Sequence, residues 1–221
     1  MTDAHGGPFT GHDLDRLTSL VVAAWSAGRD RDWSRPAGTV AWTCTRTAAR
    51  RVLERNGRNG LTMRTLADEL EIKAPSLYKH VAGKAAIEAV LVESALTEMG
   101  AALHAAVRDP GEEGRVRALL AAYRAVARAD PNLYRLATAG PLDRAAIAAG
   151  LEDWAGEPFL LATGDPYLAQ ALWAFAHGTA VLEIDGRFLP GSDLDRTWAE
   201  GAAAFEAAGA LRARAGQDDR R

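Results

Sequence analysis

The chain has 221 residues, of which 48% are hydrophobic and 25% are charged, and its formal net charge at pH 7 is −3. These values are typical of a globular protein that is long enough for one large domain or two small ones. The single cysteine, Cys44, excludes an intramolecular disulfide and favours a reducing, cytoplasmic location.

Nothing in the sequence indicates export or membrane insertion. The N-terminus lacks the basic start and the apolar run of a signal peptide. The most apolar long stretch, Leu168–Ile184, contains Gln170, His177 and Glu183 and falls short of the roughly 20 residues that span a bilayer. We therefore expect a buried helix there and no membrane partner.

Residues 1–42 are expected to form an N-terminal extension with one helix. Residues 1–12 are rich in Gly, His, Thr and Pro, a composition typical of disordered termini. The next residues carry apolar side chains at the threes and fours of a helix, at Leu14, Leu17, Val21 and Trp25. Gly28 is expected to end this helix.

The next segment, residues 43–105, is expected to contain two short helices joined by a tight turn and flanked by longer helices. The expected helices run from near Thr43 to Asn56, from Met63 to Leu70, from about Lys73, and from Gly83 to about Val107. Thr62 is a good N-cap for the first short helix. Pro75 fits the first turn of the second, where its missing N–H costs little. This arrangement is a helix-turn-helix pattern.

Residues 106–215 are expected to form a second helical domain. The candidate helices are Glu113–Ala129, Pro131–Thr138, Leu142–Ala155, Pro166–Ile184 and Leu194–Ala215, with breaks between them that include Gly156–Pro158. No alternating strand pattern and no internal repeat occurs in the sequence. The predicted fold class is therefore all-α.

The second short helix carries side chains that suit a DNA contact. An α-helix with its side chains is about as wide as the major groove, so a short helix can enter the groove. Ser76, Lys79 and His80 can donate hydrogen bonds, and Tyr78 can reach a phosphate or a thymine methyl group. Lys84 and the N–H groups at the start of the following helix would hold a phosphate.

The stretch GLTMRTLADELEIKAPSLYKHVAGKAAIEAVL resembles the DNA-binding segment of the tetracycline-repressor (TetR/AcrR) family. The matching features are the Leu61-Thr62 start, the Leu66-Ala67 pair, the run Leu77-Tyr78-x-His80-Val81, and Lys84 at the next helix start. The resemblance implies a dimeric repressor of transcription that binds double-stranded DNA and has a ligand-binding C-terminal domain. The expected DNA contacts are Thr62, Met63, Arg64, Lys73, Ala74, Pro75, Ser76, Tyr78, Lys79, His80 and Lys84.

Two features of charge bear on this interpretation. Residues 46–84 hold nine Lys and Arg against four Asp and Glu, so a basic segment lies within an acidic chain and favours a polyanionic partner. Glu71, by contrast, occupies the turn position where the family usually has Gly. That position is expected to need a positive φ, which costs a non-glycine residue about 1 kcal/mol. The carboxylate is also expected to lower non-specific affinity for DNA.

The stretch ALWAFAHGTAVLEIDGRF is similar to a C-terminal domain type of the same family, which is marked by the spacing of Trp173, His177 and Gly178. A small-molecule site needs an aromatic and apolar lining with a few polar groups, although ordinary core packing is the competing interpretation for each residue. No charged side chain stands out as a partner, so we expect a small, largely apolar effector. The expected ligand-binding residues are Tyr123, Trp154, Phe159, Trp173 and His177, with Tyr134, Tyr167 and Phe175 as further aromatic lining.

The last helix carries an apolar stripe that suits a dimer interface. Its members are Leu194, Trp198, Phe205 and Gly209. A palindromic operator needs two DNA-binding heads roughly 34 Å apart, which a homodimer would supply. The alternative is that these residues pack on the core of their own domain.

Residues 9–45 have some similarity to the N-terminus of the DinB-like, mycothiol-dependent maleylpyruvate isomerases, which bind a metal through histidines. Here Ala48-Ala49-Arg50 stands where an acidic residue and a histidine are expected, so no metal-binding set can be assembled from His5 and His12. We expect no catalytic residues, no metal and no cofactor, and hence no enzyme. A ligand-responsive repressor is favoured, ahead of a DNA-binding regulator without a small effector and a metal-dependent transferase.

Overall fold

The computed structural model describes residues 40–78 and 81–218, and within these residues the regular structure is entirely helical. The predicted all-α fold class is therefore confirmed. The predicted helix of the N-terminal extension lies outside the described residues, as do Lys79 and His80. No helix in the described part of the chain is both long and apolar enough to cross a membrane.

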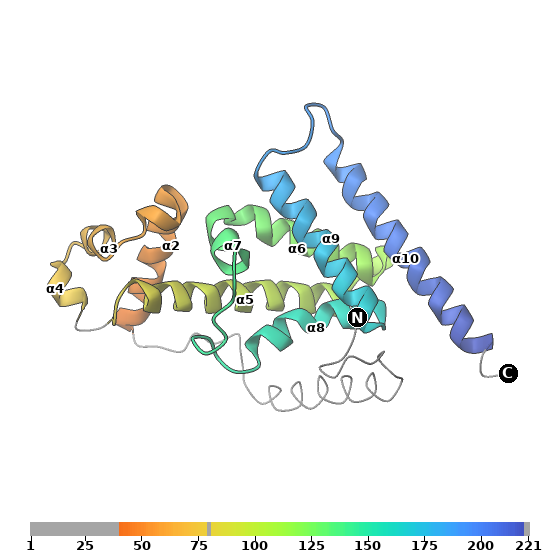
Figure 1. The fold of residues 1–221 in the computed structure, drawn as a ribbon, viewed down its shortest axis with the longest axis horizontal. Coiled ribbons are helices and arrows are strands. Elements are labelled where there is room, and N and C mark those ends of the chain that lie inside the picture. Colours follow the sequence, from red (N-terminus) through yellow and green to blue (C-terminus); the bar gives the residue numbers. More distant parts are fainter. Residues whose placement is uncertain (1–39, 79–80, 219–221) are drawn as a thin grey trace, which may run out of the picture.

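A small group of helices, the head, forms one end of the molecule (Figure 1). It consists of α2 (Val40–Gly60), α3 (Met63–Glu69) and α4 (Ala74–Leu77). The helix expected to stop at Asn56 is kinked at the next residue, Gly57 (φ 67°), and adds one further turn. A buried apolar cluster holds the head together: Ala48, Ala49, Val52, Leu53, Leu61, Leu66, Ala67, Leu77, Val81, Ile87 and Leu91, with Leu133 and Leu136 from the body.

A single long helix, α5 (Lys84–Arg108), runs from the head into the body (Figure 1). The body comprises the turn η1 (Gly111–Glu113) and the helices α6 (Arg115–Ala129), α7 (Pro131–Thr138), α8 (Leu151–Thr163), α9 (Pro166–Ile184) and α10 (Leu194–Asp218). The helix bounds expected for α7 and α9 are reproduced. The division into domains at residues 42 and 105 stays a prediction, because α5 continues through the second boundary.

The prediction of a helix over Leu142–Ala155 is wrong. Residues 139–150 form turns and loop, and α8 begins at Leu151 and continues through the expected break at Gly156–Pro158. Proline lacks the N–H that would donate to the carbonyl oxygen of Trp154 four residues earlier. Nε2 of His104 lies 2.9 Å from that oxygen, so a side chain of α5 takes over the interaction. The buried Pro158 is therefore accommodated inside α8.

Helix α7 contributes to the hydrophobic cores of both the head and the body. Leu133 and Leu136 belong to the head cluster, whereas Tyr134 belongs to the body cluster. Polar contacts with α2 reinforce this position: the carboxylate of Glu54 accepts hydrogen bonds from the N–H groups of Asn132 (3.3 Å) and Leu133 (2.7 Å). These N–H groups lie at the start of α7 and have no partner within the helix, so Glu54 caps it from the head.

Candidate nucleic-acid interface and effector core

The short helix α4 presents an exposed edge on a buried anchor. The anchor consists of Leu77, the last residue of α4, and Val81, which follows the helix; they are 1% and 3% exposed. Tyr78, at the C-cap of α4, is 57% exposed. Pro75 lies in the first turn of α4, as expected, and Lys73 occupies the N-cap position. The expected contact residues Lys73, Pro75, Ser76 and Tyr78 all lie exposed on this edge, and Ala74 is half-buried.

The start of α3 lies before the same turn and is held by a capping box. Thr62 Oγ1 accepts from the N–H of Thr65 (3.1 Å), and Thr65 Oγ1 accepts from the N–H of Thr62 (2.9 Å). The predicted N-cap is therefore confirmed. Thr62 and Arg64 are exposed and Met63 is half-buried. Arg64 makes no hydrogen bond or ion pair with another described residue, so its guanidinium group stays available for a phosphate.

Lys84 is held by interactions within the head. Its Nζ donates to the carbonyl oxygen of Arg58 (2.8 Å) and lies 3.7 Å from Oε1 of Glu88. Arg58 in turn donates two hydrogen bonds to the Glu88 carboxylate, at 3.1 and 3.0 Å. A phosphate at the start of α5 would therefore compete with Glu88 for both cations.

Acidic residues also pair with the basic face of α2. Arg51 and Arg55 both donate to the half-buried carboxylate of Glu69. The hydrogen bonds from Arg55 and then from Arg51 lower the pKa of this carboxyl group. Arg50 bridges Glu98 (2.7 Å) and Asp130. Much of the basic charge between residues 46 and 84 is thus compensated by neighbours in space, which the count of charges along the sequence does not show.

The turn between α3 and α4 has the backbone conformation expected from the sequence. Glu71 has φ 55° and is the one non-glycine residue with positive φ in the described part of the chain. Its side chain is exposed, so no packing contact offsets the strain. The predicted positive φ is confirmed, and a carboxylate lies beside the exposed edge of α4.

In the body, aromatic residues that are distant in sequence form one hydrogen-bonded group. The Tyr134 hydroxyl group lies 2.9 Å from the Tyr123 hydroxyl group and 2.8 Å from Nδ1 of His177. Phe159 packs edge-on against Tyr123 with a centroid separation of 5.9 Å, and Trp173 stacks on His177 at 6.1 Å. Four of the expected ligand-binding residues, Tyr123, Phe159, Trp173 and His177, thus gather around Tyr134.

Burial changes the ionisation of this aromatic group. It raises the pKa of Tyr134 to about 12 and the pKa of Tyr123 further, so both phenols stay neutral donors and acceptors. It lowers the pKa of His177, which favours the neutral imidazole. Trp173 is half exposed, so the group reaches the surface of the described chain at that ring. The group is therefore neutral and apolar, with a few polar atoms.

Other expected lining residues lie elsewhere. Trp154 stacks on His104 at 4.9 Å and covers Gly100 on α5, where an added Cβ would lie 2.3 Å from the indole ring. Tyr167 is exposed at the start of α9, and Phe175 packs against α10. The structure therefore separates these residues from the group around Tyr134.

The apolar stripe of α10 packs largely on its own chain. Trp198 is 6% exposed, lies edge-on to Phe175 at 5.9 Å and donates from Nε1 to Glu183 (2.9 Å). Phe205 also lies against Phe175, at 5.7 Å, whereas Leu194 and Gly209 are half-buried. The alternative interpretation, packing on the domain's own core, thus describes Trp198 and Phe205.

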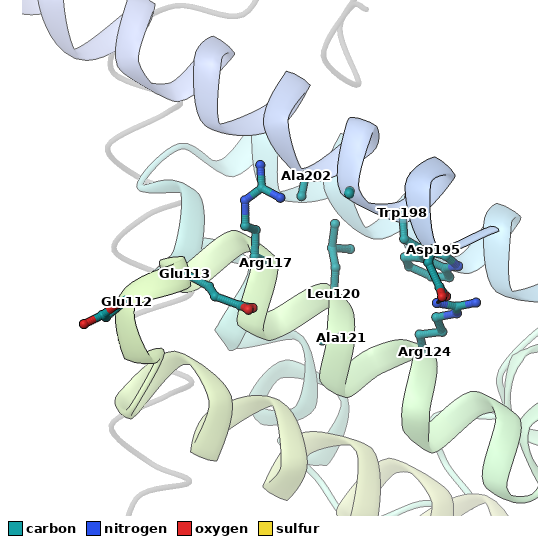
Figure 2. Close-up of a pocket in the computed structure, with 10 residues that line it drawn as sticks. Glu112, Glu113, Arg117, Leu120, Ala121, Arg124, Asp195, Trp198 and Ala202 are labelled. Carbon is teal, nitrogen blue, oxygen red and sulfur yellow. Dashed lines mark hydrogen bonds and ion pairs between the residues drawn. The ribbon is translucent and has the colours of Figure 1, made fainter. Parts of the chain in front are cut away.

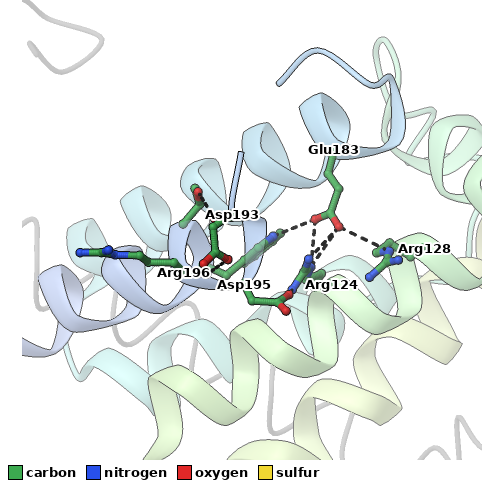
Figure 3. Close-up of polar contacts among 8 residues, drawn as sticks. Arg124, Arg128, Glu183, Asp193, Asp195 and Arg196 are labelled. Carbon is green, nitrogen blue, oxygen red and sulfur yellow. Dashed lines mark hydrogen bonds and ion pairs between the residues drawn. The ribbon is translucent and has the colours of Figure 1, made fainter. Parts of the chain in front are cut away.

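A buried carboxylate that the sequence interpretation missed organises this side of the body (Figure 3). Glu183 accepts hydrogen bonds from Arg124 and Trp198, and Arg128 lies 3.4 Å from it. Arg124 also donates to the exposed Asp195 (2.6 Å). These residues come from α6, α9 and α10 and have no sequence spacing that would bring them together. Within the described residues, no group of His, Cys, Asp and Glu could hold a metal ion.

Two family models match the two parts of this architecture. The model described as "Bacterial regulatory proteins, tetR family" matches residues 46–89, and the model described as "Tetracyclin repressor-like, C-terminal domain" matches residues 116–205. The chain belongs to the TetR family. It is therefore a DNA-binding transcriptional regulator, and members of this family are generally not enzymes.

Solved structures share the TetR fold. A protein of unknown function from Rhodococcus sp. RHA1 has 24% identity and a TM-score of 0.64, over 76% of this chain and 95% of its own. A TetR variant from Acinetobacter baumannii AYE in complex with minocycline has 20% identity and a TM-score of 0.53, over 74% of this chain and 93% of its own. The multidrug binding protein EbrR complexed with imidazole has 22% identity and a TM-score of 0.54, over 77% of this chain and 90% of its own. A search of curated proteins found no match.

Proposed function

We propose that this TetR-family regulator represses transcription by binding a palindromic operator as a homodimer, and that a small, largely apolar effector releases it. The observation that carries the proposal is the exposed edge of α4, with Tyr78 outward on the buried anchor of Leu77 and Val81. A short helix held in this way can enter the major groove. As a DNA-binding regulator, the protein would act in the cytoplasm.

The group around Tyr134 supports the effector part of the proposal. Its aromatic rings and few polar atoms suit a largely apolar ligand. Two structural relatives are described in complex with small molecules, minocycline and imidazole. In the group around Tyr134, Trp173 is exposed and His177 is half-buried, whereas Tyr123 and Phe159 are buried. Trp173 and His177 would therefore meet the effector first. Trp154 would contribute only if the effector reached the other side of α8.

Helix α7 offers a route from the effector to the head. Tyr134 bonds to His177 in the body, while the neighbouring Leu133 and Leu136 pack in the head core. An effector that competes for His177 would shift Tyr134 and, with it, the α7 surface on which α2 rests. Binding of the effector would then favour a head position that no longer matches the operator.

The DNA-binding proposal is tested with the DNA upstream of the chain's own gene, by footprinting and by gel-shift titration at several salt concentrations. We expect a protected palindrome and an affinity that falls as salt rises, because counterions are released from the phosphates. Tyr78→Ala is expected to weaken specific binding by about tenfold, the loss of about 1.4 kcal/mol. Leu189→Ala, at an exposed position of the α9–α10 loop, is the matched control and should leave affinity unchanged.

A footprint that persists in every salt concentration, or no footprint at all, would argue against the proposal. Light scattering tests the homodimer, since a monomer at micromolar concentration contradicts binding to a palindrome by paired heads. A thermal-shift screen of small apolar compounds tests the effector. If no compound both stabilises the protein and releases the DNA, the alternative of a regulator without a small effector is favoured.

A further inference from the structure

Two cations from different helices of the head meet at one carboxylate. Nε and Nη2 of Arg58 donate to the two oxygens of Glu88, at 3.1 and 3.0 Å. Nζ of Lys84 lies 3.7 Å from Oε1 of Glu88 and donates to the carbonyl oxygen of Arg58 (2.8 Å). Two positive charges and one negative charge therefore lie together beside the start of α5, and the cluster keeps a net positive charge.

The cations of this cluster are accessible and the carboxylate is largely covered. The side chains of Arg58 and Lys84 are 59% and 39% exposed, whereas that of Glu88 is 16% exposed. A guanidinium group binds a carboxylate or a phosphate with the same pair of parallel N–H bonds. The bonds that now join Arg58 to Glu88 are therefore the bonds that a phosphate would use.

The backbone beside the cluster also suits a phosphate. The first N–H groups of α5 have no partner within the helix, because the first helical bond runs from the Ile87 N–H group to the Gly83 carbonyl oxygen (3.3 Å). A Cβ built on Gly83 would meet no atom of the described residues within 4 Å, chain neighbours aside, so the backbone there is open to approach. Arg58 and Lys84 thus add charge to a helix start that already favours an anion.

An arginine of the body is paired in a different way. Figure 2 shows the open groove between α6 and α10, where Arg124 reaches across to Asp195. Arg124 also donates to Glu183, and its side chain is 17% exposed. Two carboxylates thus enclose this guanidinium group. In the head, by contrast, Arg58 and Lys84 outnumber their carboxylate, so the cluster still attracts an anion.

We propose that Arg58 and Lys84 form one seat for a DNA phosphate and that Glu88 is an internal competitor for this seat. In the free protein, the Glu88 carboxylate holds both cations. On DNA, a phosphate binds their exposed side and takes over the hydrogen bonds of Glu88. The exchange weakens binding to operator and random DNA by the same factor, because phosphate contacts carry no sequence information. This inference rests on the proposed DNA-binding function and adds Arg58 and Glu88 to the residues that set its affinity.

The test titrates the full chain into two labelled duplexes, the protected operator and a random sequence, and follows fluorescence anisotropy at several salt concentrations. Glu88→Gln keeps the shape of the side chain and removes its charge. We expect it to raise the affinity for both duplexes about tenfold at about 0.1 M salt. The plot of log affinity against log salt should become steeper by about one unit per head, because one more phosphate charge is neutralised.

Glu69→Gln is the matched control for this substitution. The Glu69 side chain is 15% exposed and also pairs with two cations, Arg51 and Arg55, but lies at the end of α3. Its affinity for DNA should stay within about twofold of the parent chain, because salt screens charges that do not touch the DNA. If Glu69→Gln raises the affinity as much as Glu88→Gln does, the net charge of the head is the cause and the inference is wrong.

A second pair of variants tests the contribution of Arg58. In the Glu88→Gln chain, Arg58→Gln is expected to remove the gains in affinity and in salt dependence. Arg55→Gln, at an arginine of the same helix with the same 59% exposure, should keep both gains. In the parent chain, Arg58→Gln leaves Lys84 to Glu88 alone, so the affinity for both duplexes should fall. If Arg58→Gln changes neither chain, Arg58 does not contact a phosphate and the shared seat is wrong.

The outcome can be separated from that of the proposed function. A parent chain that binds neither duplex overturns the proposed function itself. A parent chain that binds its operator, together with a Glu88→Gln chain that binds no more tightly, overturns only the competition at the seat. Urea unfolding of each variant shows that the compared chains are folded, and Arg58→Gln in the parent chain tests the seat independently of any change at Glu88.

Discussion

The hydroxyl group of Tyr134 lies 2.8 Å from Nδ1 of His177, and this hydrogen bond joins α7 to α9. The same hydroxyl group lies 2.9 Å from that of Tyr123, so one phenol links three helices of the body. Tyr134→Phe would leave the other two groups without this partner at a buried site. We expect the free energy of unfolding to fall by about 1–3 kcal/mol, measured by urea denaturation.

The matched control for this substitution is Tyr167→Phe, at an exposed tyrosine of α9. Its hydroxyl group makes no hydrogen bond to another described residue, so its removal should change stability by less than about 0.5 kcal/mol. Equal losses for the two variants would show that the hydrogen bonds of Tyr134 do not stabilise the body.

The stability of the protein is expected to fall in mildly acidic solution. Burial lowers the pKa of His177, and burial followed by the charge of Arg108 lowers the pKa of His104 against the opposing Trp154 carbonyl. As the pH falls, the unfolded chain therefore protonates these two histidines at a higher pH than the folded chain does. Their contribution is complete above the ordinary histidine pKa of about 6.5 and is lost as the pH falls from there toward the lowered values.

Urea denaturation between about pH 5 and pH 8 measures this dependence. His104→Gln and His177→Gln should each flatten the curve below about pH 6.5. The carboxylate Glu183 titrates in a separate range, because its pKa lies below the ordinary value of 4.5. A stability curve that is flat from pH 5 to about 6.5 in the parent chain would contradict the expectation.

Glu71→Gly is expected to stabilise the head and to strengthen DNA binding. Glycine adopts the φ of 55° without strain, which should raise the free energy of unfolding by about 1 kcal/mol. Loss of the carboxylate should raise affinity for DNA at low salt. Glu71→Ala separates the two effects, because it removes the charge and keeps the strain. If Glu71→Ala stabilises the head as much as Glu71→Gly does, backbone strain is not the cause.

The packing of α10 on α9 depends on the glycine at position 201. A Cβ built there would lie 2.0 Å from the Phe175 ring, so Gly201→Ala should destabilise the protein by about 1–3 kcal/mol in thermal or urea unfolding. Gly178 on α9 has no atom within 4 Å of such a Cβ. Gly178→Ala should therefore stabilise the helix by about 0.5–1 kcal/mol. A fall in stability for Gly178→Ala would indicate that another surface covers this glycine.

Local signals in the sequence predicted much of the head. Thr62 as an N-cap, Pro75 in a first helical turn and the positive φ at Glu71 each depend on one or two neighbouring residues, and the structure confirms all three. The buried faces of α3 and α4 follow from helical spacing. The family motif lies within this part of the chain, so the kind of function could be predicted as well.

Local signals failed where a distant residue changes the balance. Gly156–Pro158 predicted a helix break, yet α8 continues because His104, 50 residues away, bonds to the Trp154 carbonyl. The stripe of Trp198 and Phe205 has the same spacing whether it meets a partner chain or its own α9. Spacing identifies an apolar face but not the surface that covers it.

The sequence by itself determined the helical class, the DNA-binding motif and the strained turn, because each depends on residues close together along the chain. The tertiary structure decided which aromatic residues meet around Tyr134, which cations of the head are already paired, and that α6 and α10 leave a groove between them. These features depend on distances between helices, and such distances follow from how all the side chains pack together.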